Sequence, residues 1–346
     1  MTHTATALEL EKTARALVAP GKGILAADES TGTIEKRFKS ISIANSEDNR
    51  RAYRNMLFTT PGFGEFISGV ILYDETIKQK GLDGTPFPQT LEKCGSMPGI
   101  KVDTGAIALP GSPDEKRTNG LDGLRERLAE YKKLGARFAK WRAVITIGEQ
   151  IPSRHCIVDN AHALAVYAAL CQEQGIVPIV EPEVLMDWSN TIERCYEVTE
   201  ATLNEVFSAL RAHDVHLEGI LLKPNMVIAG KQCPKQNTAK EVAEWTIRCF
   251  ERTVPAAVPG IVFLSGGQSS AQATANLSAM NALRAHPWQL SFSYGRALQD
   301  EALKAWKGDA KNVGAGQKAF HARAKMNSAA RTGKYSESME RELVKA

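Results

Sequence analysis

The sequence predicts an α/β protein built on a single (β/α)8 TIM barrel, with extra helices at its N- and C-terminal ends. Eight short apolar runs recur along the chain, and most are separated by a segment with helical periodicity. Strands that alternate with helices are typical of a parallel sheet. No linker interrupts the units, and Gly21-Lys-Gly23 precedes the first run, whereas an open dinucleotide-binding sheet has its glycine motif after that strand. Both observations favour the closed barrel.

Each expected strand is a short apolar run that leads into polar residues. The runs are residues 22–27, 66–73, 98–103, 136–142, 177–183, 217–223, 260–266 and 289–295. The sixth run contains a buried strand that delivers Lys223 at its end. Pro224 follows immediately, and because proline has no N–H, it prevents further ladder pairing.

Apolar residues at helical spacing predict the helices. The clearest case is a set of four that fall on one helix face: Leu121, Leu124, Leu128 and Tyr131. Gly135 ends that helix, as glycine often does. The other expected helices are residues 4–17, 34–39, 46–58, 155–174, 190–212, 239–252, 269–285, 297–306 and 314–330. We expect one catalytic domain over residues 1–331 and a polar, flexible C-terminal tail over 332–346.

Composition excludes several classes of protein. A net charge of +4 on 346 residues, with no basic run among aromatics, argues against nucleic-acid binding. The six cysteines are scattered and form no CxxC pair, which indicates reduced thiols in a cytoplasmic compartment. The N-terminal residues have no basic start with an apolar core, so neither a signal peptide nor a membrane segment is expected. The alternative is a mature organelle form that has lost a transit peptide.

Charged residues gather where the expected strands end. In a barrel, the carboxyl ends of the strands and the loops after them converge on one face. Three strands carry two charged residues two positions apart, so each pair shares one face: Lys101 and Asp103, Lys140 and Arg142, Glu181 and Glu183. Buried charges are costly unless they are paired or functional. One pair would be unremarkable, but three pairs with Asp28 and Lys223 at the same end indicate a catalytic pocket.

Lys223 and Lys140 are both candidate amine nucleophiles. A strand-end lysine read alone is usually an ordinary surface residue. Desolvation favours the neutral amine, which is the form that attacks a carbonyl. Spacing alone does not decide which of the two lysines would form an imine, and the one that stays protonated would lower the pKa of the other by repulsion.

Glycines after the last two strands predict a phosphate site. Ser265-Gly-Gly267 precedes an expected helix, and Gly295-Arg296 opens the helix after the eighth strand. Loops at these places in a barrel are the usual phosphate site, because glycine amides and helix N-termini present N–H groups to an anion. Tight turns alone would also explain the glycines, but the arginine strengthens the functional interpretation.

These residues together suggest an amine nucleophile, carboxylates for proton transfer and a phosphorylated substrate. None of the seven histidines falls at a strand end, and the cysteines lack metal-ligand spacing, so no metal site is expected. The chemistry that combines these parts is Schiff-base carbon–carbon cleavage, in which a protonated imine withdraws electrons where a metal otherwise would.

Seven segments closely resemble the class I fructose-1,6-bisphosphate aldolase family, and the resemblance runs in the same order from about residue 8 to about residue 330. They are Leu25-Ala-Ala-Asp-Glu-Ser-Thr-Gly32, Gly99-Ile-Lys-Val-Asp103, Phe138-Ala-Lys-Trp-Arg142, Ile179-Val-Glu-Pro-Glu183, Gly219-Ile-Leu-Leu-Lys-Pro-Asn-Met226, Val262-Phe-Leu-Ser-Gly-Gly-Gln268 and Phe292-Ser-Tyr-Gly-Arg-Ala-Leu298. The resemblance implies a metal-independent glycolytic lyase that acts on sugar phosphates, needs no cofactor, binds no membrane and forms a homotetramer.

The resemblance also implies a role for each matching residue. Lys223 would form the imine with the ketone, and Glu181 would be the acid and base for carbinolamine dehydration. Lys140 and Glu183 would tune the charge beside them. Asp28 would take the proton from the C4 hydroxyl as the C3–C4 bond breaks. The phosphate on the ketone side would be held by Ser265, Gly266, Gly295 and Arg296, and the other phosphate would face Ser30, Thr33, Arg37, Lys101 and Arg142.

The sequence departs from the family pattern in two places. Thr33 stands where many members have serine, which keeps a hydroxyl donor. The family tail commonly ends in a tyrosine that assists proton exchange at the enamine, whereas the last tyrosine here is Tyr335. Which group replaces that tyrosine therefore stays open, and so does the preference between bisphosphate and monophosphate substrates.

Two alternative functions follow from the same residues. A related Schiff-base enzyme, transaldolase-like or specific for sedoheptulose 1,7-bisphosphate, would use a similar lysine. Two phosphate clusters at opposite ends of the pocket favour a bisphosphate. A non-catalytic protein that kept the barrel would have lost at least one of Lys223, Glu181, Asp28 and Lys140, and none is lost.

Overall fold

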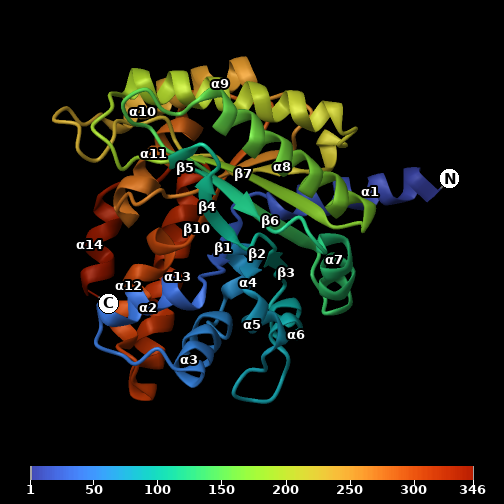
Figure 1. The fold of residues 1–346 in the computed structure, drawn as a ribbon. Helices are drawn as coiled ribbons and strands as arrows, with labels where there is room; N and C mark the ends of the chain where they lie inside the picture. Colours follow the sequence, from blue (N-terminus) through green and yellow to red (C-terminus); the bar gives the residue numbers. More distant parts are fainter. Residues whose placement is uncertain (1, 346) are drawn as a thin grey trace.

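Each of the eight apolar runs contributes a strand to one closed parallel barrel (Figure 1). The computed structural model describes residues 2–345, so Met1 and Ala346, the outer limits of the expected domain and tail, lie outside the described residues. The strands are β1 (Gly23–Ala27), β2 (Ile67–Leu72), β3 (Met97–Lys101), β6 (Phe138–Ile145), β7 (Val177–Val184), β8 (Leu221–Leu222), β9 (Gly260–Phe263) and β10 (Gln289–Tyr294). Around the barrel they follow the order β1, β10, β9, β8, β7, β6, β3, β2. The predicted (β/α)8 barrel is confirmed.

The strand that carries Lys223 is shorter than the sequence predicts. Residues Leu217–Gly219 form the 3-10 helix η1, and β8 has only two residues. A methyl group on Gly219 would lie 2.9 Å from Cβ of Leu10. The chain therefore turns closely over the N-terminal helix before it can pair. Pairing then holds Lys223 itself, whose N–H donates to the carbonyl of Val180 at 2.8 Å.

The expected helices all form, with small shifts at their ends. They are α1 (Thr2–Leu17), α2 (Thr31–Lys39), α3 (Glu47–Phe58), α7 (Leu124–Lys133), α8 (Arg154–Glu173), α9 (Ile192–Ala212), α10 (Ala239–Thr253), α11 (Ser270–Leu283), α12 (Arg296–Trp306) and α13 (Val313–Ala330). Besides η1, the described residues form five short helices that the sequence did not predict: α4 (Phe63–Phe66), α5 (Asp74–Lys78), α6 (Phe87–Lys93), η2 (Ala310–Asn312) and α14 (Ser338–Lys345).

A β-hairpin between β3 and α7 was also not predicted. Strands β4 (Gly105–Leu109) and β5 (Ser112–Asn119) pair antiparallel. The turn between them contains Gly111 at a φ of 76°, a conformation that favours glycine. The hydroxyl of Thr118 donates to the carbonyl of Arg142 at 2.8 Å. The hairpin is therefore fastened to β6 beside the carboxyl ends of the strands.

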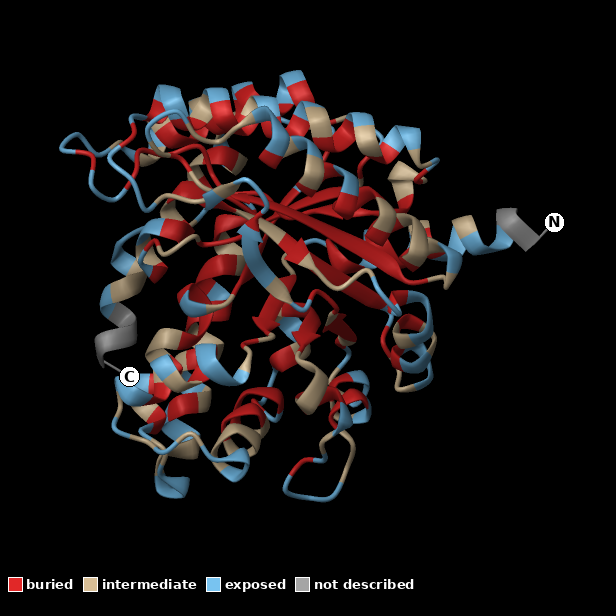
Figure 2. Cartoon of the chain, viewed as in Figure 1, coloured by how far each residue is buried: buried red, intermediate tan, exposed pale blue. Residues whose placement is uncertain are grey.

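Helix α1 closes the amino-terminal end of the barrel. Its Leu10, Ala14 and Leu17, with Val18 after it, form one buried apolar cluster with side chains of strands β1, β2, β6, β7, β8 and β9. A second, larger cluster joins the strands to the surrounding helices. The strands are accordingly buried along most of their length (Figure 2). Polar groups lie at the opposite end of the barrel, where the strands have their carboxyl ends.

The expectation of a flexible tail over residues 332–346 stays a prediction. Helix α14 lies in this segment, and the carboxylate of Glu340 forms an ion pair with Nη1 of Arg323 at 2.6 Å. The hydroxyl of Tyr335 donates to the same carboxylate at 2.7 Å. These contacts attach the described part of the tail to helix α13.

A buried arginine joins the two ends of the chain. Arg331, 7% exposed, follows helix α13. Its guanidinium donates to the carbonyls of Lys22 at 2.6 Å and of Val18 and Leu290 at 3.2 Å. These acceptors lie before β1 and within β10, so one side chain fastens the C-terminal helix to the two strands that close the barrel.

We expect Arg331→Lys to lower the free energy of unfolding by about 2–4 kcal/mol, because an ammonium cannot satisfy carbonyls that the guanidinium reaches in several directions. Equilibrium denaturation with guanidinium chloride would measure the loss. Arg154→Lys is the matched control, since the Arg154 side chain is 87% exposed. Equal stability of the two variants would contradict a structural role for Arg331.

Candidate active site

All of the residues predicted for the site line one cavity of about 810 Å³ at the carboxyl end of the barrel strands. They come from seven of the eight barrel strands or the segments after them, all except β2, and in chain order they are Asp28, Ser30, Thr33, Arg37, Lys101, Lys140, Arg142, Glu181, Glu183, Lys223, Ser265, Gly266, Gly295 and Arg296. The barrel topology therefore brings together groups that lie far apart in the sequence, as the resemblance implied.

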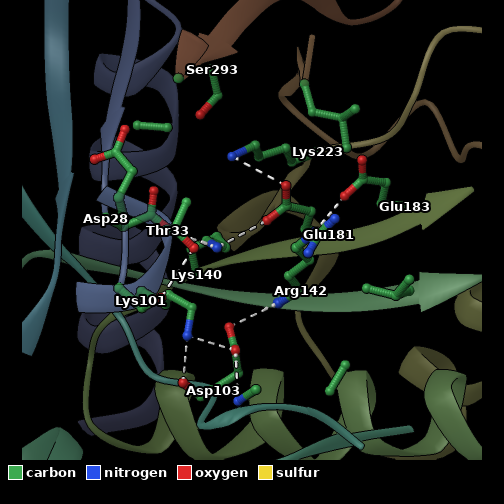
Figure 3. Close-up of a pocket in the computed structure, with 18 of the residues that line it drawn as sticks. Asp28, Thr33, Lys101, Asp103, Lys140, Arg142, Glu181, Glu183, Lys223 and Ser293 are labelled. Carbon is green, nitrogen blue, oxygen red and sulfur yellow. Dashed lines mark hydrogen bonds and ion pairs between the residues drawn. The ribbon is translucent and has the colours of Figure 1, made fainter. Parts of the chain in front are cut away.

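A row of four alternating charges lies in this cavity (Figure 3). Nζ of Lys140 is 2.7 Å from Oδ2 of Asp28 and 3.3 Å from Oε2 of Glu181. Nζ of Lys223 is 3.2 Å from Oε1 of Glu181. Lys140, Glu181 and Lys223 are each 3% exposed. Each buried charge is thus adjacent to an opposite one, which is the condition for keeping it ionised away from water.

Glu181 sits between the two lysines without being fully satisfied. Its Oε2 is buried and accepts no well-aligned hydrogen bond, although Lys140 lies at ion-pair distance from it. A buried carboxylate oxygen with a free lone pair is costly in a purely structural role. It is well placed, however, to exchange a proton with a molecule bound in the cavity.

The neighbouring charges shift the pKa values of Asp28 and Lys140 in the row. Burial alone would raise the pKa of Asp28, but attraction to Lys140, Lys223 and Lys101 outweighs it and holds that pKa well below its ordinary value. Burial alone would lower the pKa of Lys140, but Asp28, Glu181 and Asp103 attract its ammonium and raise that pKa instead. Asp28 is therefore a carboxylate and Lys140 an ammonium at neutral pH.

The neighbouring charges form a second layer. Nε of Arg142 donates to Oε2 of Glu183 in a close ion pair. Asp103 holds Lys101 through its Oδ1 and its carbonyl oxygen, each 2.7 Å from Nζ. The other carboxylate oxygen of Asp103 accepts from the N–H of Arg142 at 3.3 Å. Asp103, 7% exposed, therefore positions two predicted phosphate ligands at once.

Gly266 and Gly267, in the loop after β9, form a backbone segment without side chains that we call the glycine cradle. Gly266 and Gly267 have φ angles of 57° and 89°, which residues with a side chain rarely adopt. Helices α11 and α12 begin directly after this cradle and after Gly295. A methyl group on Gly267 would lie 2.9 Å from Nη2 of Arg296. N–H groups, helix N-termini and a guanidinium thus face the same space, as in other phosphate sites.

Arg37 reaches Gly295 from helix α2. A methyl group on Gly295 would lie 3.3 Å from Nη2 of Arg37. Nη1 of Arg37 is 2.6 Å from Oε1 of Glu29, and the other oxygen of Glu29 is 2.7 Å from Nη2 of Arg54. The resemblance groups Arg37 with the other phosphate, but its position also allows it to reach the ketone-side cluster.

Among residues 2–345, no group of three or more His, Cys, Asp or Glu residues could hold a metal ion. In the same range, no helix is long and apolar enough to cross a membrane.

Comparisons with known proteins agree with this geometry. Residues 9–346 match a family model described as "Glycolytic: Fructose-bisphosphate aldolase class-I". The chain belongs to this family. It is 60% identical over 328 residues to a probable fructose-bisphosphate aldolase class 1 of Xanthomonas axonopodis pv. citri, covering 94% of this chain and 98% of that protein. It is 55% identical over 328 residues to a cytoplasmic isozyme from Spinacia oleracea, covering 94% and 92%.

A solved aldolase has the same fold. The Plasmodium falciparum fructose-bisphosphate aldolase, crystallised with TRAP and a small-molecule inhibitor, superposes with a TM-score of 0.95 at 51% identity, covering 96% of each chain. Membership of the class I aldolase family, the barrel and the assignment to the carbon–carbon lyases are thereby confirmed. The comparisons do not favour the transaldolase-like alternative.

Sequence reasoning missed some of the residues that line this cavity. Lys231 and Asp187 line the cavity from loops after β8 and β7, and Glu29 does so beside Arg37. Ser293, 1% exposed, also lines it with a hydroxyl that lacks a hydrogen-bond partner. Only Ser293 had a usable signal, because it is one of the polar residues that end the eighth strand. Tyr335 lies in a separate hollow along helix α11.

The lowered pKa of Asp28 predicts how acid affects stability. The ionised carboxylate contributes stability above the ordinary aspartate pKa of 3.8, and this contribution is lost as pH falls toward the lower pKa of the folded state. We therefore expect Asp28→Asn to be less stable than the original chain by about 2–4 kcal/mol at neutral pH. The gap should stay constant down to about pH 5 and narrow below about pH 4.

Denaturant titrations at a series of pH values would measure this gap. Asp114→Asn, at an exposed position of strand β5, is the matched control and should show no such gap. A gap that widens in acid would mean that the pKa of Asp28 is raised rather than lowered.

Proposed function

We propose that this chain cleaves fructose 1,6-bisphosphate reversibly to dihydroxyacetone phosphate and glyceraldehyde 3-phosphate, as a step of glycolysis and gluconeogenesis. The observation that carries the proposal is the row of Asp28, Lys140, Glu181 and Lys223, the last three of them buried, inside a cavity with a glycine cradle. Membership of the class I aldolase family and the names of its relatives support the same substrate.

Lys223 is the amine that we assign to imine formation. Lys140 contacts two carboxylates, and the resulting rise in its pKa makes it a poor nucleophile. Lys223 contacts one carboxylate, Glu181, and lies next to the ammonium of Lys140 across that residue. Lys223 is therefore the less strongly paired of the two amines, and we assign attack on the ketone to it.

The row suggests the order of the steps. Glu181 takes a proton from Lys223, 3.2 Å away, and the resulting neutral amine adds to the C2 carbonyl. Glu181 then returns the proton to the hydroxyl, which leaves the carbinolamine as water. The resulting protonated imine accepts the electron pair of the C3–C4 bond as that bond breaks. Asp28, kept ionised by its neighbours, takes the C4 hydroxyl proton, so that glyceraldehyde 3-phosphate departs as an aldehyde and an enamine remains. Protonation at C3 and hydrolysis then release dihydroxyacetone phosphate and free Lys223.

Two anion sites account for a bisphosphate substrate. We assign the ketone-side phosphate to Ser265, Gly266, Gly295 and Arg296. The other phosphate is assigned to Ser30, Thr33, Lys101 and Arg142, with Arg37 between the two clusters. Lys101 and Arg142 are both held by Asp103, which supports a preformed site at that end. Because phosphates at both ends position the C3–C4 bond, a bisphosphate should react better than a monophosphate.

Further properties are proposed from the family alone. We expect a cytoplasmic homotetramer that needs no metal or other cofactor, since class I members use the lysine imine in place of a metal. The spinach relative is named a cytoplasmic isozyme, which supports that location. No nucleic-acid or membrane partner is proposed.

Borohydride reduction in the presence of dihydroxyacetone phosphate should trap the imine on Lys223, as measured by peptide mass mapping. Lys223→Arg keeps the charge but cannot form the imine, so it should lose both the label and, on the order of 10⁴-fold, the cleavage rate. Lys140→Arg is the matched control and should still be labelled at Lys223. A label on Lys140, or activity that a metal chelator abolishes, would overturn the assignment.

The two anion sites predict that a substitution at one of them changes the KM for the bisphosphate but not for the monophosphate. Lys101→Met should raise KM for fructose 1,6-bisphosphate about 10-fold, because a charge-assisted contact to the far phosphate is lost. KM for fructose 1-phosphate, which lacks that phosphate, should change by less than about twofold. Initial-rate kinetics on both substrates would measure the split, with Lys133→Met on the exposed side of helix α7 as the control. An equal rise for both substrates would argue against this role.

A further inference from the structure

Two loops form a wall beside the glycine cradle. Residues 185–190 follow β7 and residues 229–233 follow the Lys223 segment, and three backbone hydrogen bonds join them. The N–H of Gly230 donates to Asn190 at 2.8 Å, that of Lys231 to Met186 at 2.7 Å, and that of Gln232 to Trp188 at 3.1 Å. The backbone at Lys231 is therefore held in a fixed position.

The wall packs closely on itself and on the cradle. A methyl group on Gly230 would lie 2.0 Å from the carbonyl oxygen of Trp188, so the loops can approach this closely only because residue 230 is glycine. A methyl group on Gly266 would lie 3.2 Å from Sδ of Met186. The wall thus contacts the cradle directly.

The side chain of Lys231 extends from the wall to the cradle. A methyl group on Gly267 would lie 2.6 Å from Nζ of Lys231 and 2.9 Å from Nη2 of Arg296. Both cationic residues line the cavity. Two positive groups, one from the wall and one from the first residue of helix α12, therefore converge on one glycine, and only the arginine belongs to the set predicted from the sequence.

In the structure, Lys231 is paired with a carboxylate. Its Nζ is 2.7 Å from Oδ1 of Asp187, which also lines the cavity. The Lys231 side chain is 42% exposed and that of Asp187 is 63% exposed. Pairs in this setting contribute little to stability and are easily broken. A phosphate dianion carries more charge than a carboxylate, so it competes well for the ammonium.

We propose that Lys231 is a second cationic ligand of the ketone-side phosphate, and that Asp187 holds its ammonium until the phosphate binds. The assignment rests on the proposed function, since it concerns the phosphate of that substrate. The competing interpretation is an ordinary surface ion pair beside the cavity, which predicts that neither residue affects substrate binding.

Kinetics in the direction of condensation separate the two ends of the substrate. Dihydroxyacetone phosphate carries only the ketone-side phosphate, and glyceraldehyde 3-phosphate carries only the other one. Lys231→Met should raise KM for dihydroxyacetone phosphate about 10-fold, because a charge-assisted contact is lost. KM for glyceraldehyde 3-phosphate and kcat should change by less than about twofold. Lys231→Arg should retain most of the affinity, because it keeps the charge.

Asp187 provides an opposite and matched test. Asp187→Asn removes the competitor for Lys231, so KM for dihydroxyacetone phosphate should fall about two- to fivefold. In the Lys231→Met background the same substitution should have less than about half that effect, because the two residues act on one another. A substitution that merely disturbed the loop would not lower KM.

Calorimetric titration with inorganic phosphate tests binding without turnover. The original chain should bind phosphate about 10-fold more tightly than Lys231→Met. If the original chain cleaves fructose 1,6-bisphosphate but Lys231→Met keeps the original KM and phosphate affinity, the role of Lys231 is refuted and the proposed function stands. If the original chain neither cleaves the sugar nor forms the trapped imine, the proposed function fails, and the role of Lys231 fails with it.

Discussion

The site depends on one electrostatic constraint, that a charge withdrawn from water needs an opposite charge beside it. Asp28, Lys140, Glu181 and Lys223 meet this constraint by alternating along a row whose members lie 2.7–3.3 Å apart. Removing an inner member, Lys140 or Glu181, would leave an end member, Asp28 or Lys223, without its partner in the row, whereas removing an end member leaves the inner charge one partner. Its members come from different barrel strands or the residues just after them, which explains why a rigid parallel barrel is needed to hold them.

Sequence reasoning succeeded where the backbone itself determines direction. The period of two along a strand predicted that Lys140 shares a face with Arg142, and Glu181 with Glu183. Barrel topology predicted that these strand ends meet on one face of the barrel. It failed where placement depends on packing between distant segments. Neither the hairpin of β4 and β5 nor the position of Lys231 follows from local pattern, because both depend on which loop lies against which. The 3-10 turn at Leu217–Gly219 depends likewise on contact with helix α1.

The groups assigned to the reaction and the groups assigned to phosphate differ in how the barrel holds them. The groups that we assign to the reaction project from strands or the residues next to them, where backbone pairing limits their movement. The groups assigned to phosphate are backbone amides, helix N-termini and long cationic side chains, several of them held by a carboxylate, as Asp103 holds Lys101 and Glu29 holds Arg37. Such acidic partners position the cations in the absence of ligand and reduce their mutual repulsion.

The closure of the barrel links the two ends of the chain, since β1 pairs with β10 and Arg331 contacts the residues before β1. On the ribosome, helix α1 and β1 emerge before the other barrel strands, and β10 and Arg331, which complete their surroundings, emerge after the strands in between. Leu10 and Leu17 gain their partners in the apolar cluster strand by strand, and β9 is the last of these strands to be translated. The apolar face of the helix is thus covered in stages, and its last strand partner comes after most of the barrel. Partly covered apolar surface of this kind is prone to aggregation in unfinished proteins.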